Sequence, residues 1–261
     1  MDELKDFIVP HNNLKGKVAI VTGGTKGLGF GMAVTLAHYG ADVAVASRTK
    51  ADCERVANEL QQLGIRSIGV PTDVTKSVQV DEMIKRVAEE LGHVDIMICN
   101  AGSSATYKAI DFPEEEWDRV VDVDLKSVFL CARAAAKQMI AQGQGGRIIA
   151  IASDAGLKGI VGLSAYCAAK AGVVNLTKVL ALEWARYNIT VNSICPGYVP
   201  TAINAHALAD PEIREKIEMK TALRRLGKTE EVSAAVLFLA SEFSGYITGT
   251  HLLIDGGSRA G

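Results

Sequence analysis

Two side chains with the types and spacing needed for proton transfer, Tyr166 and Lys170, lie four residues apart in this sequence. On a helix, that spacing places both groups on one face. A free tyrosine, with a pKa of about 10, is a poor base near neutrality, and a nearby cation lowers that pKa toward the working range. Ser153 ends an apolar run and can donate a hydrogen bond to an oxygen beside the tyrosine. The sequence therefore predicts a centre in which Tyr166 is the acid and base and Ser153 orients and polarises an alcohol or carbonyl.

A glycine-rich turn follows the first apolar run of the chain, Val18–Val21. Glycine here lets a strand reverse sharply and lets a pyrophosphate approach backbone N–H groups at the start of a helix. It is not a Walker loop, because no Lys-Ser or Lys-Thr pair follows its last glycine. We favour a nucleotide site over a turn without a ligand, and the residues expected to bind are Gly23, Thr25, Lys26, Gly27, Leu28 and Gly29.

The end of the second apolar run, Val43–Ala46, decides which dinucleotide such a fold binds. An acidic residue there would bind the ribose hydroxyls and repel a 2′-phosphate. This sequence instead has Ser47, Arg48 and Thr49. The Arg48 guanidinium can bind a phosphate through its fork of donors, and Lys26 can add a second positive charge. We therefore predict NADP(H) rather than NAD(H).

Short apolar runs alternate with helical segments along the chain. The runs are rich in Val and Ile and suit strands of a parallel sheet covered on both faces: Val18–Val21, Val43–Ala46, Ile96–Cys99, Ile148–Ile151 and Val191–Cys195. Helical periodicity occupies Lys50–Leu63, Val78–Leu91, Glu114–Gln142, Ala165–Tyr187 and Thr229–Ala240, and Gly40, Gly64 and Gly92 stand where helices should end. This predicts an α/β, Rossmann-like, doubly wound parallel sheet of about seven strands flanked by helices, in a single domain over residues 1–261. Residues 201–221 are less regular and are either a substrate lid or an ordinary surface connection.

The spacing Thr-Gly-x-x-x-Gly-x-Gly of the turn resembles the short-chain dehydrogenase/reductase family, and the resemblance extends over nearly the whole chain. Further matches follow in order: Asp73-Val74, Cys99-Asn100-Ala101-Gly102, the set Ser153, Tyr166 and Lys170, Pro196-Gly197, and Ile254-Asp255-Gly256-Gly257. The resemblance implies that Asp73 and Val74 contact the adenine and that Asn100, Ala101 and Gly102 lie at the cofactor. It implies that Tyr166 also lies at the cofactor and that Lys170 binds the nicotinamide ribose. Pro196, Gly197, Val199 and Thr201 are then expected at the carboxamide. Relatives commonly form tetramers through the helices of Glu114–Gln142 and Ala165–Tyr187, and we expect a homotetramer.

One position departs from this family. Relatives carry Asn before the residue matching Leu125, where it helps to hold a water that links the lysine to solvent, and this chain has Asp124. Asp keeps the acceptors, loses the amide donor and adds a negative charge. We interpret Asp124 as a member of the proton relay that either pairs with Lys170 or slows proton exchange. The alternative is a helix residue that pairs locally.

Composition and spacing exclude several other classes. The 28 basic and 30 acidic residues are balanced, which argues against a nucleic-acid binder. The longest apolar runs, such as Ala234–Ala240, are too short to span a bilayer, and the acidic N-terminus is unlike a signal peptide. Five scattered cysteines indicate reduced thiols in a cytoplasmic protein, and the five histidines lack metal-ligand spacing. Gly162–Tyr166 only approximates Gly-x-Ser-x-Gly, so a serine hydrolase is disfavoured.

The substrate is the least determined part of the prediction. Contacts should come from residues 103–107, 154–163 and 201–208, which mix polar and apolar side chains. A short stretch at 182–189 resembles gluconate-type members of the family. The leading prediction is an NADP(H)-dependent alcohol dehydrogenase or carbonyl reductase for a small molecule such as a sugar acid or polyol. A 3-oxoacyl-thioester reductase and a hydroxysteroid dehydrogenase remain open, while an NADPH-sensing regulator or a scaffold would not need the Ser153, Tyr166 and Lys170 set.

Overall fold

Seven parallel strands form the central sheet of the computed structural model, which describes residues 13–201, 204 and 208–260. The strand order is β3-β2-β1-β4-β5-β6-β7. Their bounds are β1 Val18–Thr22, β2 Asp42–Ser47, β3 Ser67–Pro71, β4 Ile96–Cys99, β5 Gly146–Ile151, β6 Ile189–Pro196 and β7 His251–Ile254. The order reverses between β1 and β4, and ligands of open α/β sheets bind beyond the carboxyl ends of the strands at such a reversal.

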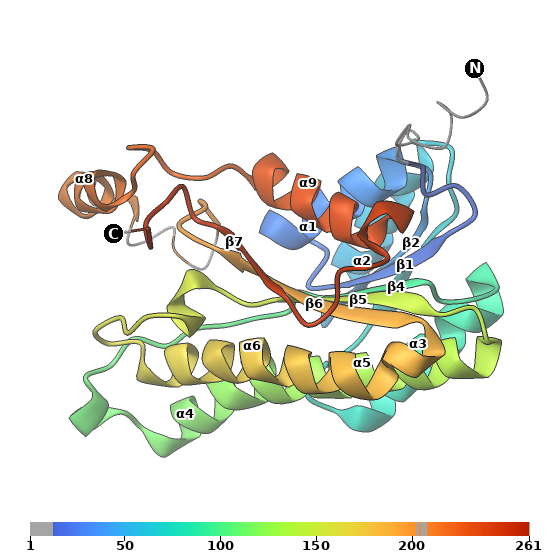
Figure 1. Ribbon diagram of the computed structural model, residues 1–261, viewed down its shortest axis with the longest axis horizontal. Coiled ribbons are helices and arrows are strands. Elements are labelled where there is room, and N and C mark those ends of the chain that lie inside the picture. Colours follow the sequence, from blue (N-terminus) through green and yellow to red (C-terminus); the bar gives the residue numbers. More distant parts are fainter. Residues whose placement is uncertain (1–12, 202–203, 205–207, 261) are drawn as a thin grey trace.

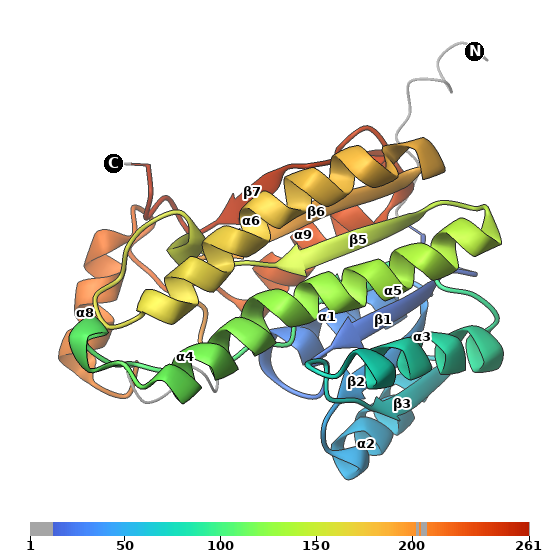
Figure 2. The same ribbon diagram turned by 90° about the horizontal axis from the view of Figure 1, so that it is seen from below.

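Helices cover both faces of the sheet, as Figure 1 shows, with α1, α2 and α9 on one side and α3, α5 and α6 on the other. Their bounds are α1 Gly27–His38, α2 Lys50–Gln61, α3 Ser77–Leu91, α4 Glu114–Val121, α5 Ser127–Gln142, α6 Ser164–Trp184, α8 Pro211–Lys220 and α9 Thr229–Ala240. Short turns complete the order: η2 Ala109–Asp111, the π-turn η3 Asp122–Lys126, η4 Asp154–Gly156, η5 Ala185–Tyr187 and η6 Glu242–Ser244. In Figure 2, β5 and β7 point toward the end of the molecule that carries α8.

Two apolar cores lie on the opposite faces of this sheet. Alternate residues of β1 divide between them: Val18 and Ile20 pack with the side of α3, α5 and α6, and Ala19 and Val21 with the side of α1 and α9. Burial on both faces explains why the strands are continuously apolar in sequence. The doubly wound sheet predicted from the sequence is confirmed.

The helix predicted over residues 114–142 is wrong in one detail, because it contains a turn of π-helix over residues 122–126. The N–H of Ser127 donates to the carbonyl of Asp122, five residues earlier, so one extra residue is accommodated in that turn. Such turns lie inside α-helices and are frequent at functional sites. Asp124 lies within the π-turn and is buried.

The predicted helix ends at Gly40, Gly64 and Gly92 are confirmed, and all three glycines have positive φ, from +82° to +101°. L side chains rarely adopt this backbone region, which is why glycine follows a helix so often.

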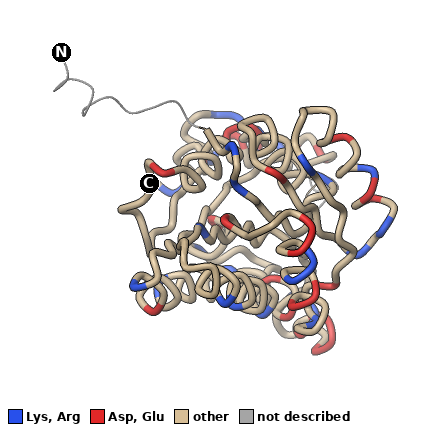
Figure 3. The backbone as a smooth tube through the Cα atoms, turned by 90° about the vertical axis from the view of Figure 1, so that its right-hand side faces the viewer, with Lys and Arg blue, Asp and Glu red and all other residues tan. Residues whose placement is uncertain are grey.

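Among the described residues, one helical stretch, Ser164–Tyr187, is long and apolar enough in composition to cross a membrane. It contains α6, which packs against β6 and buries Val173, Val174 and Leu180 in the core. A core helix passes the same test of length and composition. Figure 3 shows basic and acidic residues interspersed over the chain.

Candidate active site

A cleft beyond the carboxyl ends of β1, β4, β5 and β6 collects most of the predicted site residues. Its walls contain Gly23, Lys26, Gly27, Leu28, Gly29, Asn100, Ala101, Gly102, Asp124, Ser153, Tyr166, Lys170, Pro196, Gly197, Val199 and Thr201, together with Ile151, Ala152 and Asn204. One cleft is therefore lined by both the turn after the first strand and the proton-transfer residues. The two are more than a hundred positions apart in sequence. Groups of three or more residues that could hold a metal ion are absent from the described part of the chain.

The turn after β1 is shaped by its glycines. A Cβ on Gly29 would lie 2.2 Å from the Gly23 carbonyl oxygen and 2.5 Å from Asn100 Nδ2, so only glycine fits there. Gly23 itself has φ +63°. The helix that follows begins at Gly27, and neither a capping side chain nor an acidic residue occupies its first turn. These features leave backbone N–H groups able to bind an anion, so the turn fits a dinucleotide pyrophosphate.

Asn100 holds this turn in place from β4. Its Nδ2 donates to the carbonyl of Thr22 at 2.8 Å and to that of Gly23 at 3.3 Å. Its own backbone N–H donates to Thr22 Oγ1 at 3.0 Å, and the N–H of Ala101 donates to the same oxygen at 3.2 Å. The amide of Asn100 is therefore committed to the protein backbone, a role that the sequence did not reveal.

The remaining predicted cofactor residues lie outside the lining of this cleft: Thr25 in the turn after β1, and Ser47, Arg48, Thr49, Asp73 and Val74 at the ends of β2 and β3. Arg48 and Thr49 are exposed. Burial raises the pKa of Asp73, but hydrogen bonds from Thr75 and the positive charges of Lys76 and Arg48 lower it overall. The charge of Arg48, which follows β2, therefore favours the ionised form of Asp73, which follows β3.

Lys170 is anchored deep in the cleft wall. It is only 3% exposed, and its Nζ donates to the carbonyl of Ile151 at 2.9 Å. The same nitrogen lies 3.2 Å from Asp124 Oδ1 and 5.6 Å from the centre of the Tyr166 ring. Burial lowers the pKa of Lys170, but the charge of Asp124 and the proximity of Tyr166 raise it overall. The lysine therefore carries its positive charge at neutral pH.

The expected lowering of the Tyr166 pKa by Lys170 is not the net result in this chain. Burial raises the pKa of Tyr166, Lys170 lowers it, and Asp124 raises it again. A hydrogen bond with Ser153 lowers it and the charge of Asp154 raises it. The sum is a pKa above the usual value of 10.0, because burial and two carboxylates outweigh one ammonium. The prediction from sequence was wrong in direction because burial, Asp124 and Asp154 act on the phenol as well as Lys170.

A second charged pair lies beside Ser153 and was missed. Ser153 Oγ accepts a hydrogen bond from the N–H of Ala155 at 3.1 Å and lies 3.3 Å from Asp154 Oδ1, to which it donates. Asp154 is buried, and its other oxygen forms an ion pair with Lys158. Opposite charges four residues apart were the signal that could have found this pair.

The turn after β6 forms the far wall of the cleft. A Cβ on Gly197 would lie 2.8 Å from the Cα of Asp255, which explains the glycine. Asn204, which the sequence placed only among general substrate contacts, fixes the next residues: its Oδ1 accepts from the N–H of Thr201 at 2.8 Å and its Nδ2 donates to the carbonyl of Val199 at 2.7 Å. Residues 202–203 and 205–207, which belong to the predicted lid and substrate segment, lie outside the described residues.

Comparison with known proteins agrees with this geometry. Residues 23–259 match the family model described as enoyl-(acyl carrier protein) reductase. The chain is 38% identical to the 2-dehydro-3-deoxy-D-gluconate 5-dehydrogenase of Escherichia coli, over 94% of this chain and 96% of that protein. It is 37% identical to a 3-oxoacyl-(acyl-carrier-protein) reductase of Staphylococcus epidermidis, over 92% and 98% of the two chains. The crystal structure of a gluconate 5-dehydrogenase from Burkholderia cenocepacia in complex with NADP and tartrate superimposes with a TM-score of 0.93 at 31% identity, over 95% and 97% of the chains.

A parallel seven-stranded sheet with a glycine turn after its first strand and a Ser-Tyr-Lys set at its carboxyl edge defines a class of dehydrogenases that act on CH–OH groups. The chain belongs to that class, the short-chain dehydrogenase/reductase family. The family resemblance drawn from the motifs is confirmed, including the likeness to gluconate-type members.

Proposed function

We propose that this protein is an NADP(H)-dependent alcohol dehydrogenase and carbonyl reductase whose substrate is a small sugar acid or polyol. The observation that carries the proposal is the convergence of Ser153, Tyr166 and Lys170 with the glycine turn in one cleft. A protein that only sensed NADPH, or served as a scaffold, would have no use for a buried lysine held against a tyrosine.

In the reductive direction, Tyr166 donates the proton to the new alkoxide, and in the oxidative direction it accepts the proton from the alcohol. Ser153 donates a hydrogen bond that holds the substrate oxygen beside the phenol. Lys170, fixed by the carbonyl of Ile151 and paired with Asp124, supplies a positive charge that stabilises the tyrosinate and has its third donor available for a ribose. When bound, the nicotinamide supplies the hydride in reduction and accepts it in oxidation.

NADP(H) is the proposed cofactor because the end of β2 offers donors and no acid. We propose that Arg48 binds the 2′-phosphate, with Ser47, Thr49 and Lys26 beside it. A relative of similar fold holds NADP in its crystal structure. The other proposed contacts are Gly23, Thr25, Gly27, Leu28 and Gly29 for the pyrophosphate, Asp73 and Val74 for the adenine, Asn100, Ala101 and Gly102 along the cleft, and Pro196, Gly197, Val199 and Thr201 for the nicotinamide.

A hydroxylated or acidic substrate fits the polar character of the wall near Ser153. Asp154 and Lys158, which form an ion pair directly after Ser153, add to this polar character. The names of two relatives, a dehydrodeoxygluconate dehydrogenase and a gluconate dehydrogenase, favour sugar acids. The 3-oxoacyl-(acyl-carrier-protein) reductase at similar identity keeps an acyl thioester as the second candidate.

Residues 201–221 are proposed as the substrate lid. The described part of this segment includes α8, in which every residue remains at least partly exposed. An element with little buried surface can move at low cost in free energy.

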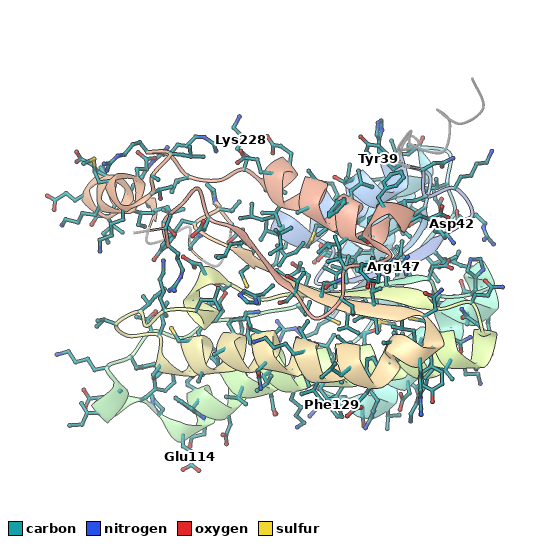
Figure 4. The ribbon with its side chains drawn as sticks, viewed as in Figure 1. Tyr39, Asp42, Glu114, Phe129, Arg147 and Lys228 are labelled. Carbon is teal, nitrogen blue, oxygen red and sulfur yellow. The ribbon has the colours of Figure 1, made fainter. Side chains whose placement is uncertain are left out.

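We propose a homotetramer located in the cytoplasm. The small residues Ala132, Ala134, Ala135 and Ala136 of α5 are all buried, so they pack inside the monomer. Larger apolar side chains lie on the outer surface of the same layer: Phe129, Ile140, Val179 and Leu182 are exposed. Figure 4 shows Phe129 on the side of that layer away from the sheet. Exposed apolar side chains on one layer fit an association surface. Light scattering should give a mass near four chains, and a monomer mass would refute the assembly.

The test of the function is NADPH oxidation with a panel of keto-sugar acids, 2-ketoacids, diketones, 3-oxoacyl thioesters and steroids. We expect the highest kcat/KM with a keto-sugar acid and NADPH, and no turnover by Tyr166→Phe with any of them. A clear preference for the thioester would transfer the assignment to the second candidate. A higher kcat/KM with NAD(H) than with NADP(H) would refute the cofactor.

A further inference from the structure

A carboxylate is buried against the lysine of the proposed proton-transfer centre. Asp124 lies in the π-turn η3 with 0% of its surface exposed, and its Oδ1 is 3.2 Å from Lys170 Nζ. An isolated charge without a partner is very costly in such a place, and only pairing and hydrogen bonds make it tolerable. Asp124 has both.

The two oxygens of Asp124 have separate tasks. Oδ2 accepts two hydrogen bonds from Ser103, one from its N–H at 2.9 Å and one from its hydroxyl at 3.1 Å. Oδ1 is buried 3.2 Å from the ammonium of Lys170. Arg119 on α4 is the second cation that Asp124 affects, because the charge of Asp124 contributes to raising the pKa of Arg119. A Cβ on Gly102 would lie 2.9 Å from Asp124 Oδ1 and 3.7 Å from Lys170 Nζ, so the glycine leaves room for the pair. The carboxylate is therefore held in a fixed position against the lysine.

The charged groups around the Tyr166 phenol act on its proton affinity in opposite directions. Lys170, on the same helix, favours the tyrosinate, and the hydrogen bond with Ser153 at the end of β5 does so as well. Asp124 on η3 and Asp154 on η4 oppose it. Cys195 on β6 adjoins Lys170, and Tyr198 after β6 adjoins both Asp154 and Tyr166, but neither thiol nor phenol is charged at neutral pH. Asp124 is thus the carboxylate that directly offsets Lys170, the cation that favours the tyrosinate.

We propose that Asp124 is a positioning residue that acts through Lys170: it offsets the lysine charge and so makes Tyr166 hold its proton to higher pH. The inference rests on the proposed role of Tyr166 as acid and base. Its consequence is a shift of both pH profiles. Alcohol oxidation, which needs the tyrosinate, rises only at higher pH, and carbonyl reduction, which needs the phenol, persists to higher pH.

The first test measures Tyr166 directly, in the chain alone and without substrate or cofactor. The ultraviolet absorbance of tyrosinate is titrated in wild type against Tyr166→Phe, and in Asp124→Asn against Asp124→Asn/Tyr166→Phe. The difference within each pair isolates the one phenol. Removing a nearby carboxylate should lower its titration midpoint by about one pH unit. An unchanged or higher midpoint in Asp124→Asn overturns the proposal, whatever the enzyme turns over.

The second test follows the pH dependence of kcat/KM in both directions, with the best substrate of the panel and its product. Asp124→Asn should move the oxidative and reductive limbs to lower pH by the same amount, because one group governs both. Asp124→Glu keeps the charge and should keep the wild-type limbs even if kcat falls. The matched control is Asp122→Asn, which removes an exposed carboxylate paired with Lys126 at 3.0 Å in the same π-turn and should leave both limbs unchanged.

A merely structural Asp124 would give a different pattern. Asp124→Asn and Asp124→Glu would then both lose kcat by similar factors at every pH, and the limbs of their pH profiles would lie at the same pH as in wild type. That result overturns the proposal. If no substrate of the panel is turned over, the proposed function fails, and the tyrosinate titration still decides the role of Asp124.

Discussion

The two ends of the cleft are built in different ways. At the nucleotide end, the turn between β1 and α1 is a backbone surface, where Gly23 and Gly29 leave space and Asn100 holds the carbonyls. At the proton-transfer end, between β5 and α6, the site consists of side chains that act on one another through charge. A backbone surface depends on sterics, which are local and nearly all-or-none. In a charge cluster, the pKa of each group is the sum of opposing electrostatic contributions, so changing one group changes the pKa values of the others.

This difference predicts how each end fails. Substitution at the nucleotide end should weaken cofactor binding, while substitution at the proton-transfer end should leave binding intact and change the rate or its pH dependence. Substitutions at each end test that contrast.

Tyr166→Phe removes the proton donor while keeping the ring. We expect kcat to fall by about 10²–10⁴-fold, because that is the usual contribution of a positioned acid or base. NADPH affinity, measured by fluorescence titration, should stay within about twofold of wild type because the phenol is not part of the backbone surface. A loss of NADPH binding equal to the loss of rate would break the separation between the two ends.

Gly29→Ala places a Cβ within 2.2 Å of the Gly23 carbonyl oxygen, which is backbone and cannot move aside. We expect the Kd for NADPH to rise about a hundredfold, or roughly 3 kcal/mol, because the turn must change shape. Gly159→Ala is the matched control, since a Cβ there meets nothing within 4 Å. If both variants bind NADPH equally well by calorimetry, the turn does not have the steric role assigned to it.

The same contrast explains what the sequence could and could not predict. The ends of strands and helices, and the glycine turn, follow rules that act within a few residues. The strand Ile96–Cys99 and the helix Thr229–Ala240 were therefore predicted at their observed bounds. Ser153, Tyr166 and Lys170 were found by spacing. The direction of the Tyr166 pKa was not, because it depends on burial and on Asp124 and Asp154, which approach from other segments. The π-turn at residues 122–126 was also missed, since one extra residue in a helical turn barely alters the apolar period.

Arg48→Leu tests the cofactor contact that lies outside the cleft lining. The substitution should lower kcat/KM with NADPH by about tenfold or more, because a charge-assisted hydrogen bond usually contributes that much. The kcat/KM with NADH should stay unchanged. Arg55→Leu is the matched control, because Arg55 is exposed on α2 and paired with Glu59 at 2.8 Å. Equal effects of the two substitutions would remove the basis for NADP(H) preference at the end of β2.

The smallest effect concerns the single proton of the Ser153 hydroxyl. That proton points to Asp154 in the structure, whereas reduction needs it on the substrate oxygen. Lys158 pairs with Asp154 and weakens its pull on the proton. Lys158→Met should therefore lower kcat by about fivefold, equivalent to about 1 kcal/mol, with little change in KM.

The double variant Lys158→Met/Asp154→Asn decides whether this account holds. Without the negative charge, Ser153 is again able to donate to the substrate, so kcat should return to within about twofold of wild type. A loss in the double variant at least as large as in Lys158→Met alone would mean that Lys158 acts on the substrate directly rather than through Asp154. The charge of Lys158 would then affect the bound substrate more strongly than it affects Asp154.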